Sequence, residues 1–448
     1  MGKFLKELDA KKLLAIALPV SVQSLIQSFL GMIDQVMIGQ LGETAVAAVS
    51  LGCRPGFILI YTLSGITAAA SIFASQYEGA GDRSQIAKVM RSTIFGCFFL
   101  VLPFFLSAIL VPKVLLRIFT SDAAVINAGA PYLQICALSY IPLIFIMACS
   151  AILRSTGKAN IPMITGIVAV IVNTGLNAIF IFGLLGCPAF GVKGAAAATV
   201  ISYIVEVVIL IVYMQRISHE GSVLQAFKTH CPKDFIKAFS ITALPAIGNE
   251  LLWALGDSGY TAIYGRMGTE QLAAMTLTFP VQGLTVGFFS GLSAAAGIII
   301  GNLQGAGKAK QAYTAAWDFF KLCIVGCAVM GLIMTACAGL YTGFYNVSES
   351  VRTTAKQLLI IFAFFLWIKV SNMVILGGVL RSGGQTRYTL FLDVLGTWGM
   401  GIPLGIIGAF VLKADIKLVY VLVSIEEIVR LILGLIRVKS RKWIQRIV

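Results

Sequence analysis

Ionisable and amide side chains inside apolar stretches long enough to cross a membrane are the residues of this sequence that could do chemistry. Asp34 lies in the first such stretch, and Asn173 and Asn177 lie in the fifth, spaced i, i+4 on one helix face. A carboxylate with amide oxygens suits a hard cation such as Na⁺, and a buried carboxylate alone can carry H⁺. We therefore predict an ion site at these three residues. The alternative is that Asp34 only caps a helix end near the outer interface.

A second group of carboxylates lies in the second half of the sequence. Glu250 and Asp257 are seven residues apart on the seventh apolar stretch, and Asp393 lies on the eleventh. Because charges are costly in lipid and usually face an interior cavity, we expect these acids to bind a cation, a proton or a cationic substrate. For Asp393, a salt bridge to the nearby Arg387 is the alternative. Lys369 is a candidate internal partner for one of these carboxylates.

The sequence lacks the signatures of nucleotide-driven and hydrolytic enzymes. Residues 301–308 resemble a phosphate loop, but Asn302 replaces its first glycine and Ala309 replaces the Ser or Thr that holds magnesium. Hydrolase motifs are also missing. We therefore expect no enzyme and no cofactor, and transport would have to draw on an ion gradient.

The composition places the chain in a lipid bilayer. Of its 448 residues 58% are hydrophobic and only 12% are charged, and the mean hydropathy is +0.92. Apolar runs predict twelve transmembrane helices, six in each half of the chain. They lie near 14–38, 46–74, 89–112, 128–152, 160–185, 192–214, 238–264, 271–300, 312–341, 355–380, 386–412 and 416–437.

An internal repeat divides the sequence into two copies of one folded unit. Pro19 is matched by Pro245 at an offset of 226 residues, and Gly-Ala-Gly turns at 79–81 and 305–307 keep that offset. Six helices per copy return the chain to its starting side, so the copies are parallel, related by a pseudo-two-fold axis along the membrane normal. Such repeats predict a binding site at their interface and alternating access. We expect an N-lobe (1–214), a cytoplasmic linker (215–237) and a C-lobe (238–448).

The net charge of +15 follows membrane topology and indicates no nucleic-acid partner. With the N-terminus inside, 22 Lys and Arg residues lie on the inner side of the predicted helices and 8 lie on the outer side. By the positive-inside rule both termini are cytoplasmic, and the chain is a multi-pass protein of the cell inner (plasma) membrane.

The remaining polar residues carry less weight. A metal ion could be bound by His219, His230 and Cys231, but a linker is the simpler interpretation of this polar stretch. Glu426 and Arg430, spaced i, i+4, are expected to pair with each other. The nine scattered cysteines indicate no disulfide.

Several motifs resemble the multidrug and toxic compound extrusion (MATE) family, over nearly the whole chain. They are Met32-Ile-Asp34-Gln-Val-Met-Ile-Gly39-Gln-Leu-Gly42 with 47–50, Arg154-Ser-Thr-Gly-Lys158 with Pro162, Asn173-x-x-x-Asn177, 191–199, and Arg381-Ser-Gly-Gly-Gln-Thr386 through 403–405.

The resemblance implies an antiporter that exports organic, often cationic, compounds in exchange for Na⁺ or H⁺. It also implies that Asp34, Asn173, Asn177 and Thr199 form the N-lobe cation site. The proton-linked branch of the family often has Asp where this chain has Asn177, whereas the sodium-linked branch keeps Asn and adds an acid on the seventh helix. The coupling ion stays open, with Na⁺ favoured.

We therefore expect a monomeric, cation-coupled exporter of small organic molecules. Its partners would be the substrate, Na⁺ or H⁺, and the lipid bilayer. The rival within transport is a lipid-linked precursor flippase, which would carry a cationic cavity. The rivals from other classes are an intramembrane enzyme using paired carboxylates and a passive channel.

Overall fold

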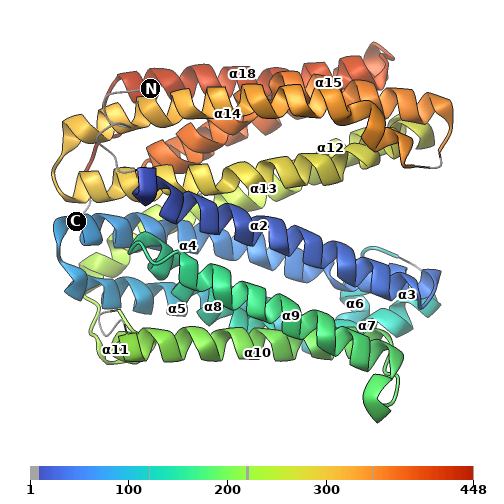
Figure 1. The fold of residues 1–448 in the computed structure, drawn as a ribbon, viewed down its shortest axis with the longest axis horizontal. Helices are drawn as coiled ribbons and strands as arrows, with labels where there is room; N and C mark the ends of the chain where they lie inside the picture. Colours follow the sequence, from blue (N-terminus) through green and yellow to red (C-terminus); the bar gives the residue numbers. More distant parts are fainter. Residues whose placement is uncertain (1–9, 121, 218–220, 346, 447–448) are drawn as a thin grey trace. The chain divides into compact units, whose positions relative to one another are not determined.

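The computed structural model describes residues 10–120, 122–217, 221–345 and 347–446, and the regular secondary structure in these residues is helical (Figure 1). Packing divides the chain into two compact units. The N-unit is Val22–Ile247, and the C-unit is Met1–Ser21 together with Gly248–Val448. The predicted lobes divide the chain by its repeat, whereas packing assigns the start of α2 to the C-unit and the start of α12 to the N-unit.

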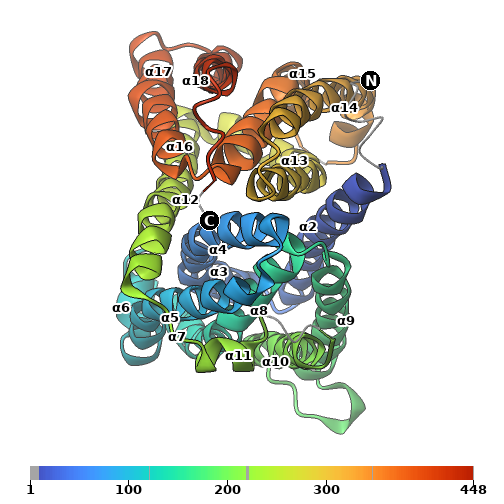
Figure 2. The same ribbon diagram turned by 90° about the vertical axis from the view of Figure 1, so that its left-hand side faces the viewer.

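The helices of the N-unit follow one another with short connections. They are α2 (Ala10–Gly39, from Val22), α3 (Glu43–Gly52), α4 (Arg54–Ala80), η1 (Arg83–Gln85), α5 (Ile86–Leu110), α6 (Pro112–Arg117), α7 (Ala123–Ala137), α8 (Tyr140–Ser155), α9 (Asn160–Phe182), η2 (Leu184–Gly186), α10 (Val192–Ile217) and α11 (Val223–Lys228). Within this unit α9 packs along α10 and α4 packs along α5, as the nearly end-on view of Figure 2 shows.

The C-unit contains longer helices, and two of them, 349–380 and 386–411, include wider π-helical turns. Its elements are α12 (Lys233–Met267, from Gly248), α13 (Thr269–Gly305), α14 (Ala309–Gly343), α15 (Glu349–Asn372) with η3 (Met373–Leu380), α16 (Thr386–Asp393) with η4 (Val394–Gly401), α17 (Ile402–Ile406) with η5 (Ile407–Val411), and α18 (Ile416–Lys439).

Two of the predicted spans are broken near a proline. The second breaks at Cys53, just before Pro55, and the fourth breaks into α7 and α8 with a bend of 46°. Pro142 lies three residues into α8, and its ring would clash with the carbonyl of Leu138, where α7 ends. The apolar pattern alone does not reveal these breaks, because the stretches on both sides remain mostly hydrophobic, apart from Arg54 beside the first break.

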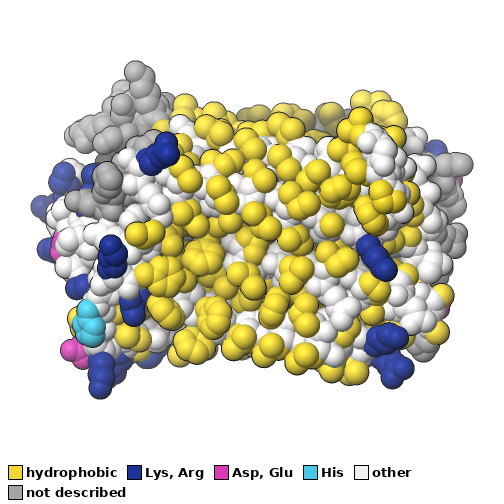
Figure 3. Space-filling model, turned by 90° about the horizontal axis from the view of Figure 1, so that it is seen from below, with side chains coloured by type: hydrophobic (Ala, Val, Ile, Leu, Met, Phe, Trp, Pro, Cys, Tyr) yellow, Lys and Arg dark blue, Asp and Glu magenta, His cyan; other side chains and the backbone are white. Residues whose placement is uncertain are grey.

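Ten helices in the described part of the chain are long and apolar enough to cross a membrane, and the bent pair α7–α8 is an eleventh candidate. The twelfth predicted span is α18, whose 24 residues include Glu426, Glu427 and Arg430. Composition alone therefore does not mark α18 as a span, and its charged residues need partners inside the fold. Figure 3 shows one face of the molecule, where hydrophobic side chains cover a broad central zone and Lys and Arg side chains gather toward its two ends.

Small residues allow close helix packing within the C-unit. A Cβ at Gly291 of α13 would lie 2.0 Å from the carbonyl oxygen of Ala17 in α2, and Ser21 Oγ donates to the carbonyl of Phe288 at 2.5 Å. The start of α2 thus contacts α13 backbone to backbone. Such contact is typical of helices that associate through small residues rather than through burial from water.

The segment predicted as a linker contains the short helix α11, which packs on α5. Ser222 caps this helix by accepting from the Gln225 amide at 3.3 Å. Arg91 of α5 donates to the Phe227 carbonyl at 2.9 Å, and Cys231 Sγ donates to the Lys88 carbonyl at 3.7 Å.

The structure does not support the metal site that was considered for the linker. His219 lies outside the described residues, and among those that are described there is no group of three metal-binding side chains. All nine cysteines are free thiols.

Candidate functional site

In the N-unit, the four residues predicted for a cation site lie in one connected group, here called the N-unit polar cluster (Asp34, Asn173, Asn177 and Thr199). Asn177 Nδ2 on α9 donates to Asp34 Oδ1 on α2 at 2.7 Å, across 143 residues of sequence. Asp34 lies inside α2, which continues to Gly39, so this carboxylate serves the interior of the unit instead of capping a helix.

The cluster continues along α9 to α10. Asn177 Nδ2 also lies 3.0 Å from Asn173 Oδ1, and Asn173 Nδ2 donates to Thr199 Oγ1 at 3.4 Å. With its amide turned over, Asn173 would donate to Asp34 Oδ1 at 3.2 Å, so it stays connected in either orientation. The i, i+4 spacing of the two asparagines therefore does place both amides on one helix face.

The cluster has the ligand chemistry of a monovalent cation site. Asn173 is 3% exposed and Asn177 is 1% exposed. The side-chain oxygen of Asn177 is buried and accepts no hydrogen bond from the described residues. Since a buried carbonyl oxygen without a donor is costly, an arriving cation would satisfy it. Carboxylate, amide and hydroxyl oxygens such as those of Asp34, Asn177 and Thr199 are ligand types that Na⁺ accepts, and a carboxylate alone can take up H⁺.

Glu206 is a further acid of the N-unit to which the sequence analysis assigned no role. It lies on α10 seven residues after Thr199, is only 6% exposed, and makes no hydrogen bond or ion pair with the residues that the structure describes. Its Oε1 lies 3.9 Å from the position of a Cβ on Gly166, and Gln23 Nε2 lies 3.6 Å from the same point. A carboxylate of the N-unit thus sits in the interior without a cationic partner.

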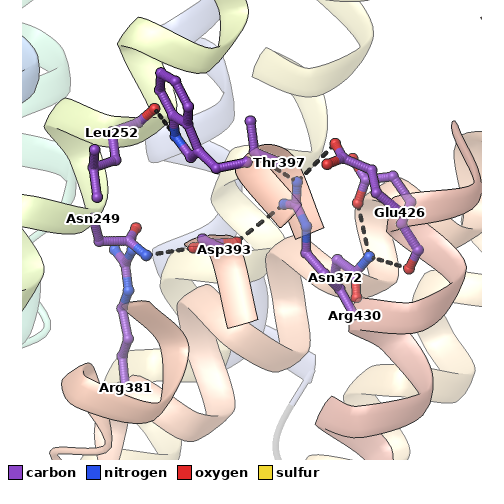
Figure 4. A network of polar contacts seen from close by, with 10 residues as sticks. Asn249, Leu252, Asn372, Arg381, Asp393, Thr397, Glu426 and Arg430 are labelled. Atoms are coloured by element: carbon purple, nitrogen blue, oxygen red, sulfur yellow. Dashed lines mark hydrogen bonds and ion pairs between the residues drawn. The ribbon is translucent and has the colours of Figure 1, made fainter. Parts of the chain in front are cut away.

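In the C-unit, two of the three predicted acids, Glu250 and Asp393, lie in a network of arginines and amides, here called the arginine network. Figure 4 shows the part of this network that surrounds Asp393 and Arg430. Its members are Asn249 and Glu250 of α12, Arg381 at the end of η3, Asp393 of α16, Thr397 of η4, and Glu426 and Arg430 of α18.

Arg430 is the centre of the arginine network. Its Nη1 lies 3.0 Å from Asp393 Oδ1, and its Nη2 donates to Glu426 Oε1 at 2.7 Å and to Thr397 Oγ1 at 2.8 Å. The predicted pair of Glu426 and Arg430 is confirmed. The alternative partner considered for Asp393 was Arg387, but its ion pair is with Arg430.

Asn249 joins the two ends of the network. Its Nδ2 donates to Asp393, and its Oδ1 accepts from Arg381 Nη2 at 2.6 Å. Arg381 Nη1 in turn lies 2.8 Å from Glu250 Oε1. Beside this network Asn372 Nδ2 donates to Glu427 Oε2 at 2.8 Å, which gives the second acid of α18 a partner.

Asp257, the remaining predicted acid, lies apart from the arginine network. It is exposed in the structure, and its carboxylate takes part in none of the ion pairs found among the described residues. Lys369, the candidate partner, makes a favourable Coulomb interaction with Asp257, and its ammonium lies 5.9 Å from the centre of the Phe362 ring. Of the three acids, Asp257 is therefore the one without a guanidinium partner.

The sequence predicts Glu426 as a partner of Arg430, but it does not predict the arginine partners of Glu250 and Asp393. Arg381 enters the sequence argument only within a family motif, and Asn249 does not enter it. The only available signal was the presence of Arg430 beside two glutamates in an apolar stretch, because a charge in such a stretch requires a partner.

Both halves of the chain match a known protein family. A family model described as MatE matches residues 19–179 and 245–407, so its two segments begin at the two prolines of the repeat. The uncharacterized transporter YisQ of Bacillus subtilis (strain 168) is 26% identical over 436 residues, which are 97% of this chain and 95% of that protein. The multidrug resistance protein MdtK of Yersinia pseudotuberculosis serotype O:1b (strain IP 31758) is 26% identical over 418 residues, 90% of this chain and 88% of that protein.

Solved structures show the same fold. A crystal structure of MATE in complex with MaL6 has a TM-score of 0.86 and 20% identity, covering 96% of this chain and 97% of that chain. A MOP superfamily transporter from Pyrococcus furiosus Vc1 (DSM3638) has a TM-score of 0.87 and 19% identity, covering 96% of each. The predicted all-α, multi-pass membrane fold is confirmed. With a family model matched over both halves, this chain belongs to the MatE family of membrane transporters.

Proposed function

We propose that this chain is a secondary antiporter that exports organic, cationic compounds in exchange for Na⁺ or H⁺ by alternating access. The observation that carries the proposal is the N-unit polar cluster, in which the buried Asn173 and Asn177 connect the half-buried Asp34 and Thr199 into a set of cation-type ligands. The name of MdtK, a multidrug resistance protein, supports export of varied organic compounds.

Asp34 would hold the coupling ion. A carboxylate in a low-dielectric interior is stabilised by a bound cation or by protonation. Binding of the ion from outside would neutralise Asp34 and favour the conformation that releases substrate, and binding of substrate from the cytoplasm would favour the return. The two steps are coupled because each ligand favours a different conformation.

Asp257 would attract the cationic cargo. Glu250 and Asp393, the other predicted acids, already have guanidinium partners at 2.8 and 3.0 Å, so they have less charge to offer a substrate. Asp257 has no guanidinium partner among the described residues, and Lys369 acts on it through a Coulomb interaction rather than an ion pair. A carboxylate together with aromatic side chains is a common means of holding organic cations.

We also propose an orientation in the membrane and an oligomeric state. The excess of Lys and Arg on one side supports cytoplasmic termini in the plasma membrane. Since one chain holds the whole polar cluster, we propose that a monomer suffices for transport. Light scattering of the purified protein in detergent would test this.

The test of the coupling site is export of a fluorescent organic cation by Asp34→Asn. Efflux is measured in inverted vesicles with Na⁺ and pH gradients imposed separately. We expect gradient-driven export to be lost while the amount of folded protein is unchanged. The matched control is Asp415→Asn, which removes an exposed acid paired with Lys417. Export by Asp34→Asn at the wild-type rate would refute the assignment, and the gradient that drives the wild type identifies the coupling ion.

The test of the cargo site compares a cationic with an uncharged dye in Asp257→Asn. We expect a severalfold higher KM for the cationic dye and no change for the uncharged one, because only the cation loses an attractive charge. An equal change for both dyes would indicate a structural role for Asp257.

A further inference from the structure

We propose that Arg430 is a built-in counter-cation, which occupies the place that an exchangeable ion would take among the acids of the C-unit. The C-unit would then bind no coupling ion, and each chain would exchange ions only at Asp34. The second statement rests on the proposed function, whereas the role of Arg430 does not.

The contacts of Arg430 resemble the coordination of a cation. Its two terminal nitrogens meet oxygens of Asp393, Glu426 and Thr397 at 3.0, 2.7 and 2.8 Å. These are two carboxylates and a hydroxyl, contributed by α16, η4 and α18. The same oxygen types would hold a metal cation if the guanidinium were removed. The side chains of Arg430 and Glu426 are only 8% and 5% exposed, so the pair is shielded from water.

The backbone of η4 is shaped to admit this guanidinium. A Cβ at Gly396 would lie 2.2 Å from Arg430 Nε, and a Cβ at Gly401 would lie 2.5 Å from Glu426 Oε2. Gly396 and Gly401 are about one turn of the wide helix apart. The absence of side chains at both positions lets the charged pair lie directly against the helix.

A neutral donor adds to the stabilisation of Asp393. Its carboxylate also accepts from Asn249 Nδ2. A carboxylate that accepts hydrogen bonds is stabilised in its charged form. Asp393 is therefore held by a guanidinium and an amide of the chain itself.

The opposite end of the arginine network is arranged in the same way. Arg381 lies between Glu250 and Asn249, at 2.8 and 2.6 Å, and Asn249 connects it to Asp393. Both predicted ion-binding acids of this network are thus neutralised by tethered guanidinium groups. In the N-unit polar cluster, by contrast, the described contacts of Asp34 include an amide but no guanidinium.

The experiment removes the tethered cation and offers a free one. Arg430→Ala is purified in detergent, and its melting temperature is measured with low millimolar guanidinium, Na⁺ or choline chloride, far below denaturing concentrations. We expect guanidinium to raise the melting temperature of Arg430→Ala by several degrees, since a ligand that binds only the folded state stabilises it. Choline is too bulky to enter and should have no effect.

Arg437→Ala is the matched control. Arg437 lies on the same helix, but its guanidinium bonds to Gln385 Oε1 and lies over the Tyr388 ring rather than pairing with a carboxylate. Wild type and Arg437→Ala should show no specific response to guanidinium. An Arg430→Ala protein that responds no more than Arg437→Ala would overturn the proposal.

A second variant covers the case in which Arg430→Ala does not fold. Arg430→Met combined with Asp393→Asn and Glu426→Gln removes the cation and its two acids together, and such replacement of buried charges is often tolerated. We expect this triple variant to fold and to keep ion-driven export, because the cluster exchanges no ion. A folded triple variant without export, or failure of both variants to accumulate, would refute the proposal.

The two proposals fail separately. If Asp34→Asn still exports but Arg430→Ala gains guanidinium-dependent stability, the coupling site is wrong and the counter-cation stands. If Asp34→Asn abolishes export and Arg430→Ala gains nothing, the coupling site stands and the counter-cation is wrong.

Discussion

The guanidinium of Arg430 lies 3.0 Å from the carboxylate of Asp393, across 37 residues of sequence, and it also bonds to Glu426 one turn away on its own helix. A local i, i+4 pair is thereby joined to a distant acid on α16. Because the three charges share one buried site, removing any of them changes the electrostatic balance of the other two.

Glutamine substitutions at two buried glutamates should change stability in opposite directions. Glu426 is paired with Arg430, so Glu426→Gln leaves a buried guanidinium with less compensation and should destabilise the protein by about 2 kcal/mol or more. Glu206 is equally buried but has no ionic partner among the described residues. Glu206→Gln removes the desolvation penalty of its charge and should stabilise by about 1 kcal/mol at alkaline pH. Thermal melts of both variants at one alkaline pH test the prediction. A loss of stability in both would show that Glu206 has a favourable charge partner.

Gly396→Ala should disturb the arginine network. The new Cβ would lie 2.2 Å from Arg430 Nε, and Arg430 is held by three hydrogen bonds and cannot move without breaking one. We expect a loss of about 2 kcal/mol of unfolding free energy. The control is Gly399→Ala in the same π-helical segment, where the nearest neighbour is 3.5 Å away and little change is expected. Equal melting temperatures for the two variants would contradict this packing.

Gly291→Ala should separate the start of α2 from α13. Its Cβ would lie 2.0 Å from the Ala17 carbonyl oxygen and 2.3 Å from Ser21 Oγ, and a backbone carbonyl cannot rotate away as a side chain can. We expect a loss of about 2–3 kcal/mol and a lower yield of folded protein. At Gly283 of the same helix a Cβ meets nothing within 4 Å, so Gly283→Ala should be neutral or stabilising by up to about 1 kcal/mol. If Gly291→Ala melts at the wild-type temperature, α2 does not pack here in solution.

Asn177→Asp should make export pH-dependent. Asn177 Nδ2 lies 2.7 Å from Asp34 Oδ1, and two carboxylates at this distance cannot both ionise without a bound cation. One of them should hold a proton at neutral pH. Export driven by a pH gradient should therefore be retained or increased in neutral solution and should fall severalfold as the pH is raised and that proton is lost.

Asn160→Asp adds the same charge at the exposed start of α9 and is the control for Asn177→Asp. A pH profile of Asn177→Asp that matches both the wild type and Asn160→Asp would place Asn177 away from the ion path.

The residues of the N-unit polar cluster were predictable from the sequence. The spacing of its asparagines is a local feature of one helix, and an acid in an apolar stretch is rare. Asn173 and Asn177 share a face through helical periodicity, and Asp34 is conspicuous as an acid in an apolar stretch. Their contact with one another could not be derived from either pattern, since helix periodicity says nothing about which helices are neighbours. The family resemblance supplied that link, and the 2.7 Å contact between Asp34 and Asn177 agrees with it.

The sequence by itself determined the membrane class, the duplicated organisation and the family, because these depend on composition, repeat spacing and motifs that survive without coordinates. The fold also agrees with the expected helices, apart from breaks near Pro55 and Pro142 and the wider turns of η3, η4 and η5. Only the tertiary structure decided which acids have partners. Whether a buried carboxylate is compensated depends on a guanidinium reaching it through space, as Arg381 reaches Glu250 and Arg430 reaches Asp393, whereas Asp34 meets an amide. Coulomb energy depends on distance and not on sequence separation, so this difference between the two units appears only when the chain is folded.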